Sequence, residues 1–283
     1  MKARDHRHRL AIFVSETIYT GTAMQKRSWT SRKTIVLALL ALFLLPLAAR
    51  AAIFAFEDRP HSWRDADWSS IGSLPPAERH PEARVLVLSG RTGGWKGVVA
   101  VHSWIVIKRE NGRDWTRYDV VGWGNPVRIN GWAPDGRWYG DRPVVIADLK
   151  GAAAEKLIPR IEAAITAYQF HNAGDYRIWP GPNSNTFVAT VLRAIPEAET
   201  ILPANAVGRD FRSLPYIGLT DSRTGIEASL WGVIGIKVGW VEGVEMNFLG
   251  LVAGLDLRNP GVKLPGFGRI GLPQQTATAA PAR

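Results

Sequence analysis

The segment Trp179-Pro180-Gly181-Pro182-Asn183-Ser184-Asn185-Thr186-Phe187 decides how the rest of the chain is organised. Its Pro-Gly-Pro is typical of a turn, and the short polar residues after it are typical of a helix N-terminus. Apolar residues at helical spacing follow, so we predict a helix over about residues 185–194. Backbone N–H groups and a serine hydroxyl would meet at its mouth, which makes this junction the first candidate for a functional site.

Strand and helix signals precede the junction. Apolar and β-branched residues recur there in short runs that are bounded by turn residues. Asn111-Gly112 is a strong hairpin turn signal between two of these runs. Pro159 interrupts a helical pattern and predicts that this helix is kinked or split. The predicted elements are strands over residues 84–89, 98–108, 115–123 and 144–149 and a helix over residues 152–170.

Two glycine-punctuated apolar segments follow the junction. Residues 230–238 and 248–257 resemble each other and predict a β-hairpin that turns near Glu242-Gly243. The polar residues Glu245 and Asn247 argue against a second membrane span in this region. Such a hairpin would either pack on the core or lie on a membrane surface, and both interpretations stay open.

The N-terminal part of the chain is basic and then apolar. Residues 1–33 carry eight Lys and Arg side chains against two acidic ones, so much of the net charge of +10 lies outside the predicted domain. A nucleic-acid partner is therefore not expected. Met24 begins a segment that is laid out like an export signal, and the true start of the chain is predicted there.

Residues 34–56 are apolar except for Thr34 and Arg50 and predict a signal sequence or a transmembrane anchor. This segment is the expected contact with the membrane. Basic residues precede it, so the body should lie outside the cytoplasm. The predicted location is the inner membrane with the body on the periplasmic side, or the periplasm or the medium if the leader is cleaved.

The rest of the chain divides into three parts. They are a linker over residues 57–83, a globular domain over residues 84–270 and a disordered tail over residues 271–283. Cysteine is absent, which excludes disulfides, thiolate metal ligands and a cysteine nucleophile. The histidines lack metal-ligand spacing and no phosphate-binding loop is complete, so neither a metal nor a cofactor is expected.

Three residues are candidates for nucleophilic catalysis. Ser184 at the helix mouth would be the nucleophile, because helix N–H groups there would stabilise an oxyanion. His102 would be the base, and Asp119 on the next strand would orient it, with Tyr118 as the alternative on the other face. Each residue also has a structural interpretation, as a helix cap, a core histidine and a solvent-facing strand residue respectively.

Asn183, Asn185, Trp132 and Trp138 are the candidate binding residues. The asparagines flank Ser184, and the two tryptophans lie in a turn-rich loop, where aromatic rings are able to stack on a ligand. Six of the twelve tryptophans lie between residues 95 and 138, and packing in the core is the competing interpretation of them.

The order of these motifs resembles a known architecture. A strand that carries His102, a second strand and then a helix that opens with Asn-Ser-Asn-Thr-Phe resemble the permuted papain-like fold of the NlpC/P60-like and lecithin–retinol acyltransferase-like hydrolases. The nucleophile of those hydrolases is a cysteine, so the resemblance implies Ser184 as nucleophile and His102 as base, with serine in place of cysteine. Residues 84–270 resemble more closely a bacterial domain-of-unknown-function family (3750), through the nine-residue segment quoted above and Gly-Arg-Trp-Tyr-Gly at Gly136–Gly140. That family resemblance implies no activity.

The predicted fold class is α+β. It consists of a small antiparallel sheet with packed helices, of permuted papain-like type, plus a C-terminal β-hairpin and an N-terminal membrane segment. One functional hypothesis is an envelope hydrolase or acyl transferase that acts on an amide or ester through Ser184 and His102. The alternative is a non-catalytic envelope module that binds a glycan, peptide or lipid on a degenerate papain-like cleft. A third hypothesis is a structural membrane protein whose hairpin contacts lipid, so the sequence leaves open whether the chain is an enzyme.

Overall fold

The computed structural model describes residues 21–272, so the start of the predicted leader and most of the predicted tail lie outside it. The chain divides into two units, residues 1–41 and residues 42–283. Helix α1, Gly21–Ala55, runs through the boundary between them. Its section Ser31–Ala55 is long and apolar enough to cross a membrane, with a mean hydropathy of 2.4. The apolar segment is therefore a helix that fits a membrane anchor or a signal sequence.

The second unit contains a five-stranded antiparallel sheet. Its strands are β1 (Arg84–Arg91), β2 (Val101–Lys108), β3 (Thr116–Val120), β4 (Val127–Ile129) and β5 (Val144–Lys150), in the order β4-β3-β2-β1-β5. β1 and β2 pair along their whole length, with Arg84 opposite Lys108 and Arg91 opposite Val101. Asn111, in the predicted hairpin turn, has a φ of 52°, the left-handed conformation that asparagine tolerates well.

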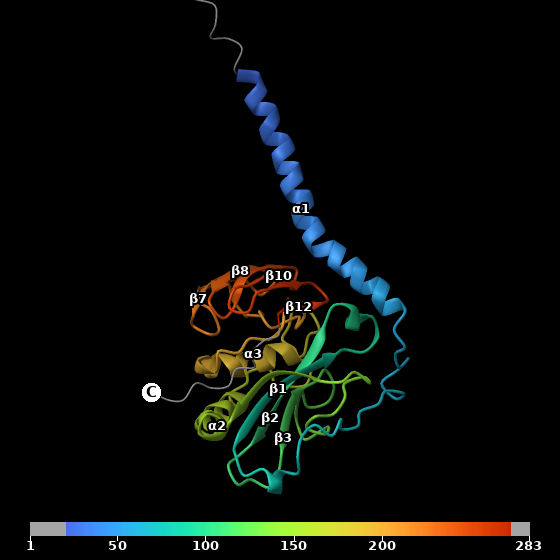
Figure 1. Ribbon diagram of the computed structural model, residues 1–283, viewed down its shortest axis with the longest axis vertical. Helices are drawn as coiled ribbons and strands as arrows, with labels where there is room; N and C mark the ends of the chain where they lie inside the picture. Colours follow the sequence, from blue (N-terminus) through green and yellow to red (C-terminus); the bar gives the residue numbers. More distant parts are fainter. Residues whose placement is uncertain (1–20, 273–283) are drawn as a thin grey trace, which may run out of the picture. The chain divides into compact units, whose positions relative to one another are not determined.

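Two helices, α2 (Gly151–Thr166) and α3 (Ser184–Ala194), cover one face of this sheet (Figure 1). Short 3-10 helices lie at Ala77–Arg79, Gly94–Val98 and Pro196–Ala198. Pro159 lies inside α2 and does not split it. Buried residues on either side of the proline, Leu157 and Ile161 among them, keep both halves of the helix on the core.

The central strands β1 and β2 of the five-stranded sheet are buried on both faces. On the helix side, Val101 and Ile105 of β2 join Phe187 of α3 in the main core. On the opposite side, Trp104 and Val106 of β2 join a second core that is rich in tryptophan. Side chains alternate along a strand, so the odd-numbered residues of β2 face the helices and the even-numbered ones face the tryptophans.

The C-terminal part of the second unit is a seven-stranded antiparallel sheet. Its strands are β6 (Tyr216–Leu219), β7 (Gly225–Leu230), β8 (Ile234–Gly239), β9 (Gly243–Phe248), β10 (Leu251–Asp256), β11 (Gly261–Leu264) and β12 (Gly268–Gly271). Each strand pairs with the one that follows it in the chain. Figure 1 shows α3 between this sheet, in orange and red, and the five-stranded sheet, in green.

The C-terminal hairpin turns where it is predicted, between β8 and β9, but the prediction of its return strand is wrong. β9 lies between β8 and β10, and Met246 is opposite Ile236 on one side and Ala253 on the other. The two similar segments therefore do not pair with each other. β8 and β10 flank the same strand and share one pattern of alternating faces, which accounts for their similarity in sequence.

Candidate functional site

The polar residues at the start of α3 form a capping box. The Asn183 side-chain oxygen accepts hydrogen bonds from the backbone N–H groups of Asn185 (3.0 Å) and Thr186 (3.2 Å). The Thr186 hydroxyl accepts one from the N–H of Asn183 at 3.1 Å. These reciprocal bonds satisfy N–H groups that a helix end leaves free, so they fix the beginning of α3 at Ser184.

Both predicted asparagines are also bound to distant backbone carbonyls. The Asn183 amide donates to the carbonyl oxygens of Ile178 (3.1 Å) and Val207 (3.0 Å). The Asn185 amide donates to those of Val101 and Val207, both at 2.8 Å. The two side chains are buried. They fasten α3 to β2 and to the loop that follows α3, and their donor groups are fully used in doing so.

Ser184 is buried at the first position of α3, with 3% of its surface exposed. Its described partner is Tyr176, whose pKa is raised by burial while the hydrogen bonds to Ser184 oppose that shift. A phenol with a raised pKa remains protonated at neutral pH and is no general base. The contact therefore holds Ser184 in place without activating its hydroxyl.

His102, Asp119 and Arg117 form a buried polar cluster. Arg117 donates to both carboxylate oxygens of Asp119, at 2.7 and 2.9 Å, and His102 Nε2 lies 2.9 Å from Asp119 Oδ1. Burial alone would raise the pKa of Asp119, but the hydrogen bond to His102 and the charge of Arg117 bring it below its ordinary value. The ionised carboxylate accepts only, so Nε2–H of His102 is the donor. The structure thus brings together the predicted base and the predicted orienting carboxylate.

Burial has the opposite effect on the imidazole itself. It lowers the pKa of His102 below the usual value, although Asp119 opposes the shift. The ring is therefore neutral at pH 7. A neutral imidazole is able to accept a proton, so the decisive question is which group its free nitrogen meets.

Ser184 and His102 lie on opposite faces of the five-stranded sheet. His102 shares its face of β2 with Trp104 and stacks on Trp138, with ring centroids 3.6 Å apart and planes 3° apart. α3, which Ser184 opens, packs on the other face through Phe187. Within residues 21–272 no hydrogen bond joins the two side chains. The predicted nucleophile–base pair is therefore not assembled. His102 is one of the even-numbered residues of β2, which face the tryptophan-rich core, whereas α3 lies on the face of the odd-numbered residues.

The tryptophan-rich face is a packed cluster and offers no open aromatic platform. Trp138 is 3% exposed, and its ring centroid lies 5.1 Å from that of Trp132 and 5.1 Å from that of Trp68. The Arg117 guanidinium lies 4.0 Å from the ring centroid of Trp104. Trp68 belongs to the segment predicted as a linker, which thus packs on the domain. Trp138 does not face a ligand as predicted, and Trp132 is half-buried against its neighbours.

A polar cavity with room for a small ligand lies away from these residues. Its volume is about 340 Å³, and its lining includes Glu57, Arg59, Arg91, Tyr139 and Asp141. None of the residues predicted to form the site lines this cavity. Across the part of the chain that the structure describes, no three Asp, Glu or His side chains come together as a metal site.

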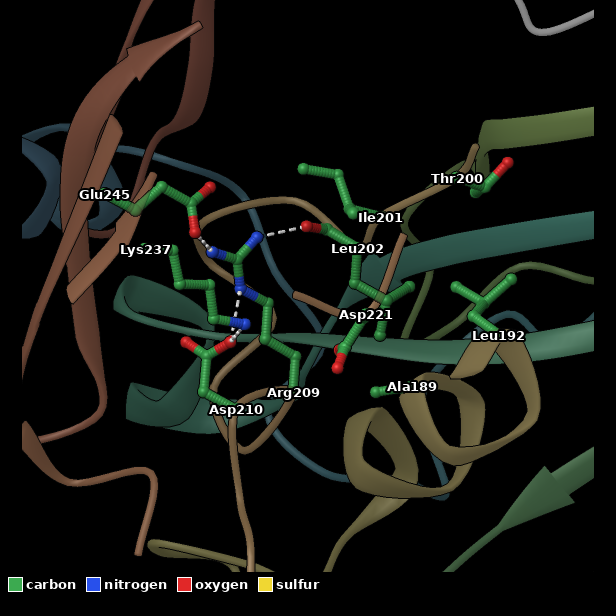
Figure 2. A pocket seen from close by; sticks show the side chains of 10 residues that line it. All are labelled: Ala189, Leu192, Thr200, Ile201, Leu202, Arg209, Asp210, Asp221, Lys237 and Glu245. Carbon is green, nitrogen blue, oxygen red and sulfur yellow. Dashed lines mark hydrogen bonds and ion pairs between the residues drawn. The ribbon is translucent and has the colours of Figure 1, made fainter. Parts of the chain in front are cut away.

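A buried ionic network lies between the seven-stranded sheet and α3, and no sequence motif indicated it (Figure 2). Lys237 Nζ lies 2.6 Å from Asp210 Oδ1, and Arg209 is paired with Glu245. Burial alone would raise the pKa of Asp221, but neighbouring cations lower it to about 2. The cavity among these groups measures about 10 Å³, roughly the space of one water. The network is therefore a polar core and not a ligand site.

Comparison with known proteins covers the central part of the chain. Residues 82–211 match the model of a family described as "Protein of unknown function (DUF3750)". This segment is similar to that family. The family segment contains the five-stranded sheet, α2 and α3, and it ends before β6, whereas the predicted resemblance reached residue 270. No curated protein and no solved structure matches the chain, and the papain-like resemblance stays a prediction.

Proposed function

We propose that this chain is a membrane-anchored envelope module that works by binding and not by catalysis. The observation that carries the proposal is that Ser184 and His102 lie on opposite faces of the five-stranded sheet. A serine nucleophile needs its base within hydrogen-bond reach, and here a layer of β-sheet separates the two. The hydrogen bonds that the Asn183 and Asn185 amide groups donate to backbone carbonyls support a structural role for the junction.

Helix α1 supports attachment to a membrane. Its section Ser31–Ala55 is of spanning length, and Arg32 and Lys33 lie at the start of that section. Positive residues stay on the cytoplasmic side, so the domain would lie on the periplasmic side of the inner membrane. Arg50 interrupts the apolar run, but it is paired with Glu57 at 2.8 Å. Its charge is thereby compensated, which favours an anchor that is retained over one that is cleaved.

A serine-reactive probe tests the catalytic alternative. The purified full chain in mild detergent is treated with a fluorophosphonate, beside a Ser184→Ala variant and an active serine hydrolase as positive control. We expect no labelling above the Ser184→Ala background, because the described contacts do not activate this hydroxyl. Labelling that depends on Ser184 would reject the proposal and favour a hydrolase or acyl transferase.

Attachment and sidedness are tested with a single introduced cysteine. The chain has none, so Lys156→Cys on the exposed side of α2 gives one reactive thiol. In spheroplasts of a bacterial host we expect a membrane-impermeant maleimide to label this thiol before lysis. We also expect the protein to stay with membranes after carbonate extraction. Recovery in the soluble fraction would contradict the anchor, and labelling only after lysis would contradict the sidedness.

A further inference from the structure

The seven-stranded sheet presents an apolar face to the outside. Each of its seven strands contributes a large apolar side chain that is at least 40% exposed: Ile217, Ile226, Ile236, Phe248, Leu255, Val262 and Ile270. Ile217 is 90% exposed and Ile226 is 67% exposed, values that are unusual for isoleucine in a regular strand. These positions recur with the period of two that a strand imposes, so they form one surface.

The charged residues of the same strands lie on the other face. Glu227 and Lys237, which follow Ile226 and Ile236, are buried and ion-paired. Every other charged residue in the seven strands is also in an ion pair on that inner side. A sheet of a soluble protein normally buries its apolar face and solvates its polar one. This sheet does the reverse, and its register is fixed because a slip by one residue would expose all the paired charges.

The outward apolar surface is large. The exposed side chains of the strands together leave on the order of 1,000 Å² of apolar area, against about 300–600 Å² for the largest patch on a typical monomer. Two tryptophans extend it at the turns, Trp231 (46% exposed) and Trp240 (59% exposed). A surface of this size and composition requires a partner that excludes water.

The chemistry of the surface favours lipid over protein. Protein interfaces are only about 56–65% apolar and carry polar groups for hydrogen bonds, whereas the outward positions of these strands hold no charged residue. Neighbouring strands satisfy one another's backbone groups everywhere except along the outer edges of β6 and β12, so the interior of the face is able to meet acyl chains without unpaired N–H or C=O groups. Tryptophan at the turns is typical of the membrane interface.

The apolar surface is also continuous with the membrane helix. Within the second unit, the ring centroid of Phe43 in α1 lies 5.9 Å from that of Phe248 in β9. The flanking residues Leu42, Leu44 and Leu45 are exposed and apolar. A helix anchored in a bilayer therefore holds this face next to the same bilayer, at a high effective concentration.

We propose that the outward face of β6–β12 contacts the lipid of the bilayer in which α1 is anchored. This inference rests on the proposed membrane attachment and names lipid as the partner that the module binds. The outward apolar side chains meet acyl chains there, because Phe248 lies against Phe43 in the middle of the membrane-spanning section of α1. The ionic network on the inner face stays on the side of the domain and is shielded from lipid by the sheet itself.

Single-cysteine labelling of the full chain tests the inference directly. The variants Ile226→Cys and Ile236→Cys place an environment-sensitive nitrobenzoxadiazole label on the outward face, and Lys156→Cys on α2 is the matched control. Each labelled protein is reconstituted in vesicles of phosphatidylcholine and phosphatidylglycerol. We expect blue-shifted emission and strong quenching by doxyl-labelled lipid at both outward positions, and quenching by aqueous iodide at the control. Outward labels that iodide quenches as strongly as the control would overturn the inference.

Other occupants give distinguishable results. Labels that are shielded from both quenchers, together with crosslinks between copies of the chain, would show that a second copy covers the face and would overturn the inference. Flotation of the same vesicles tests attachment separately. A chain that floats with vesicles while its outward labels stay open to iodide keeps the proposed function and loses the lipid-contacting face. Failure to float contradicts the proposed function itself.

A charge on the outward face gives a second, independent measurement. In Ile236→Asp with the label at Ile226→Cys, we expect a several-fold weaker doxyl quenching, because a carboxylate is costly to bury in lipid. Circular dichroism verifies that the variant is folded. Unchanged doxyl quenching in a folded Ile236→Asp variant would also overturn the inference.

Discussion

Replacement of Lys237 by methionine should lower the melting temperature of the domain substantially. Lys237 Nζ lies 2.6 Å from Asp210 Oδ1 and 3.5 Å from Glu227 Oε2, on the inner face of β8 (Figure 2 shows the contact with Asp210). Burial alone would lower the pKa of Lys237, but Asp210 and the other nearby carboxylates raise it above its ordinary value. The ammonium is therefore charged at all ordinary pH values. Methionine keeps much of its length and removes that charge.

The magnitude follows from what remains after the substitution. Removal of one partner of a buried ion pair costs about 3–5 kcal/mol, because the other charge is left uncompensated. Here Asp210 keeps a hydrogen bond from Asn247 at 3.0 Å and an ion pair with Arg209 at 3.5 Å. We therefore expect the lower end of the range, about 3 kcal/mol. At roughly 2–4 °C per kcal/mol for a domain of this size, the melting temperature should fall by about 6–12 °C.

Thermal unfolding of the full chain in detergent, followed by near-UV circular dichroism, measures this change. Lys156→Met on the exposed side of α2 is the matched control and should stay within about 0.5 kcal/mol of the wild type. The double variant Lys237→Met/Asp210→Asn should be less destabilised than the sum of the single changes by about 1–3 kcal/mol. A Lys237→Met variant as stable as the control would refute the idea that the inner face is held by paired charges.

Three further predictions concern acid stability and the predicted site. The pKa of Asp221 is about 2 in the folded protein, below its unfolded value near 4, so its contribution of about 2 kcal/mol is present above pH 4. It should be lost as the pH falls to about 2, which chemical denaturation of the full chain at pH 7, 4 and 3 will follow. Asn183→Ala should lower the free energy of unfolding by about 1–2 kcal/mol, because a helix cap is lost. Ser184→Ala should lower it by less than about 1 kcal/mol. Equal decreases in the denaturant midpoints of the two variants would contradict this order. Asp119→Asn should destabilise the chain by about 3–5 kcal/mol, because Arg117 is left buried and uncompensated, and an unchanged melting temperature would argue against the buried pair.

The elements around the junction could be predicted because their signals are local. Asn111-Gly112 marks a hairpin turn whose φ of 52° at Asn111 suits few residues. Asn183 and Thr186 cap α3 through contacts within one turn of helix. Pro159 does not split α2, because the proline rule covers the backbone alone and not the burial of residues around it, and the predicted kink stays a prediction.

The candidate site was predicted only in part, because it depends on which face a strand shows to a helix. His102 and Asp119 lie on neighbouring strands, so their contact follows from the hairpin between those strands. The alternation of side chains along β2 does not show whether His102 faces α3 or the tryptophan cluster, because this depends on how the sheet packs in the folded domain. Trp104, two residues further along β2, was the available signal: a strand that places a tryptophan on one face places His102 there as well.

The seven-stranded sheet, whose apolar face points outward, shows again that a sequence pattern does not determine which face of a strand is buried. In β8, Ile236, Lys237 and Val238 alternate, and this period predicts a strand with two unlike faces. The pattern does not state which face meets solvent; the usual assignment turns the apolar face inward. The choice is made by the partners that each face finds. The charged face forms ion pairs with Arg209 and Asp210 from the loop after α3. An apolar face in the same place would leave those two charges buried without ion-pair partners from the sheet. In the proposed membrane contact, lipid would provide for the apolar face what a hydrophobic core provides elsewhere.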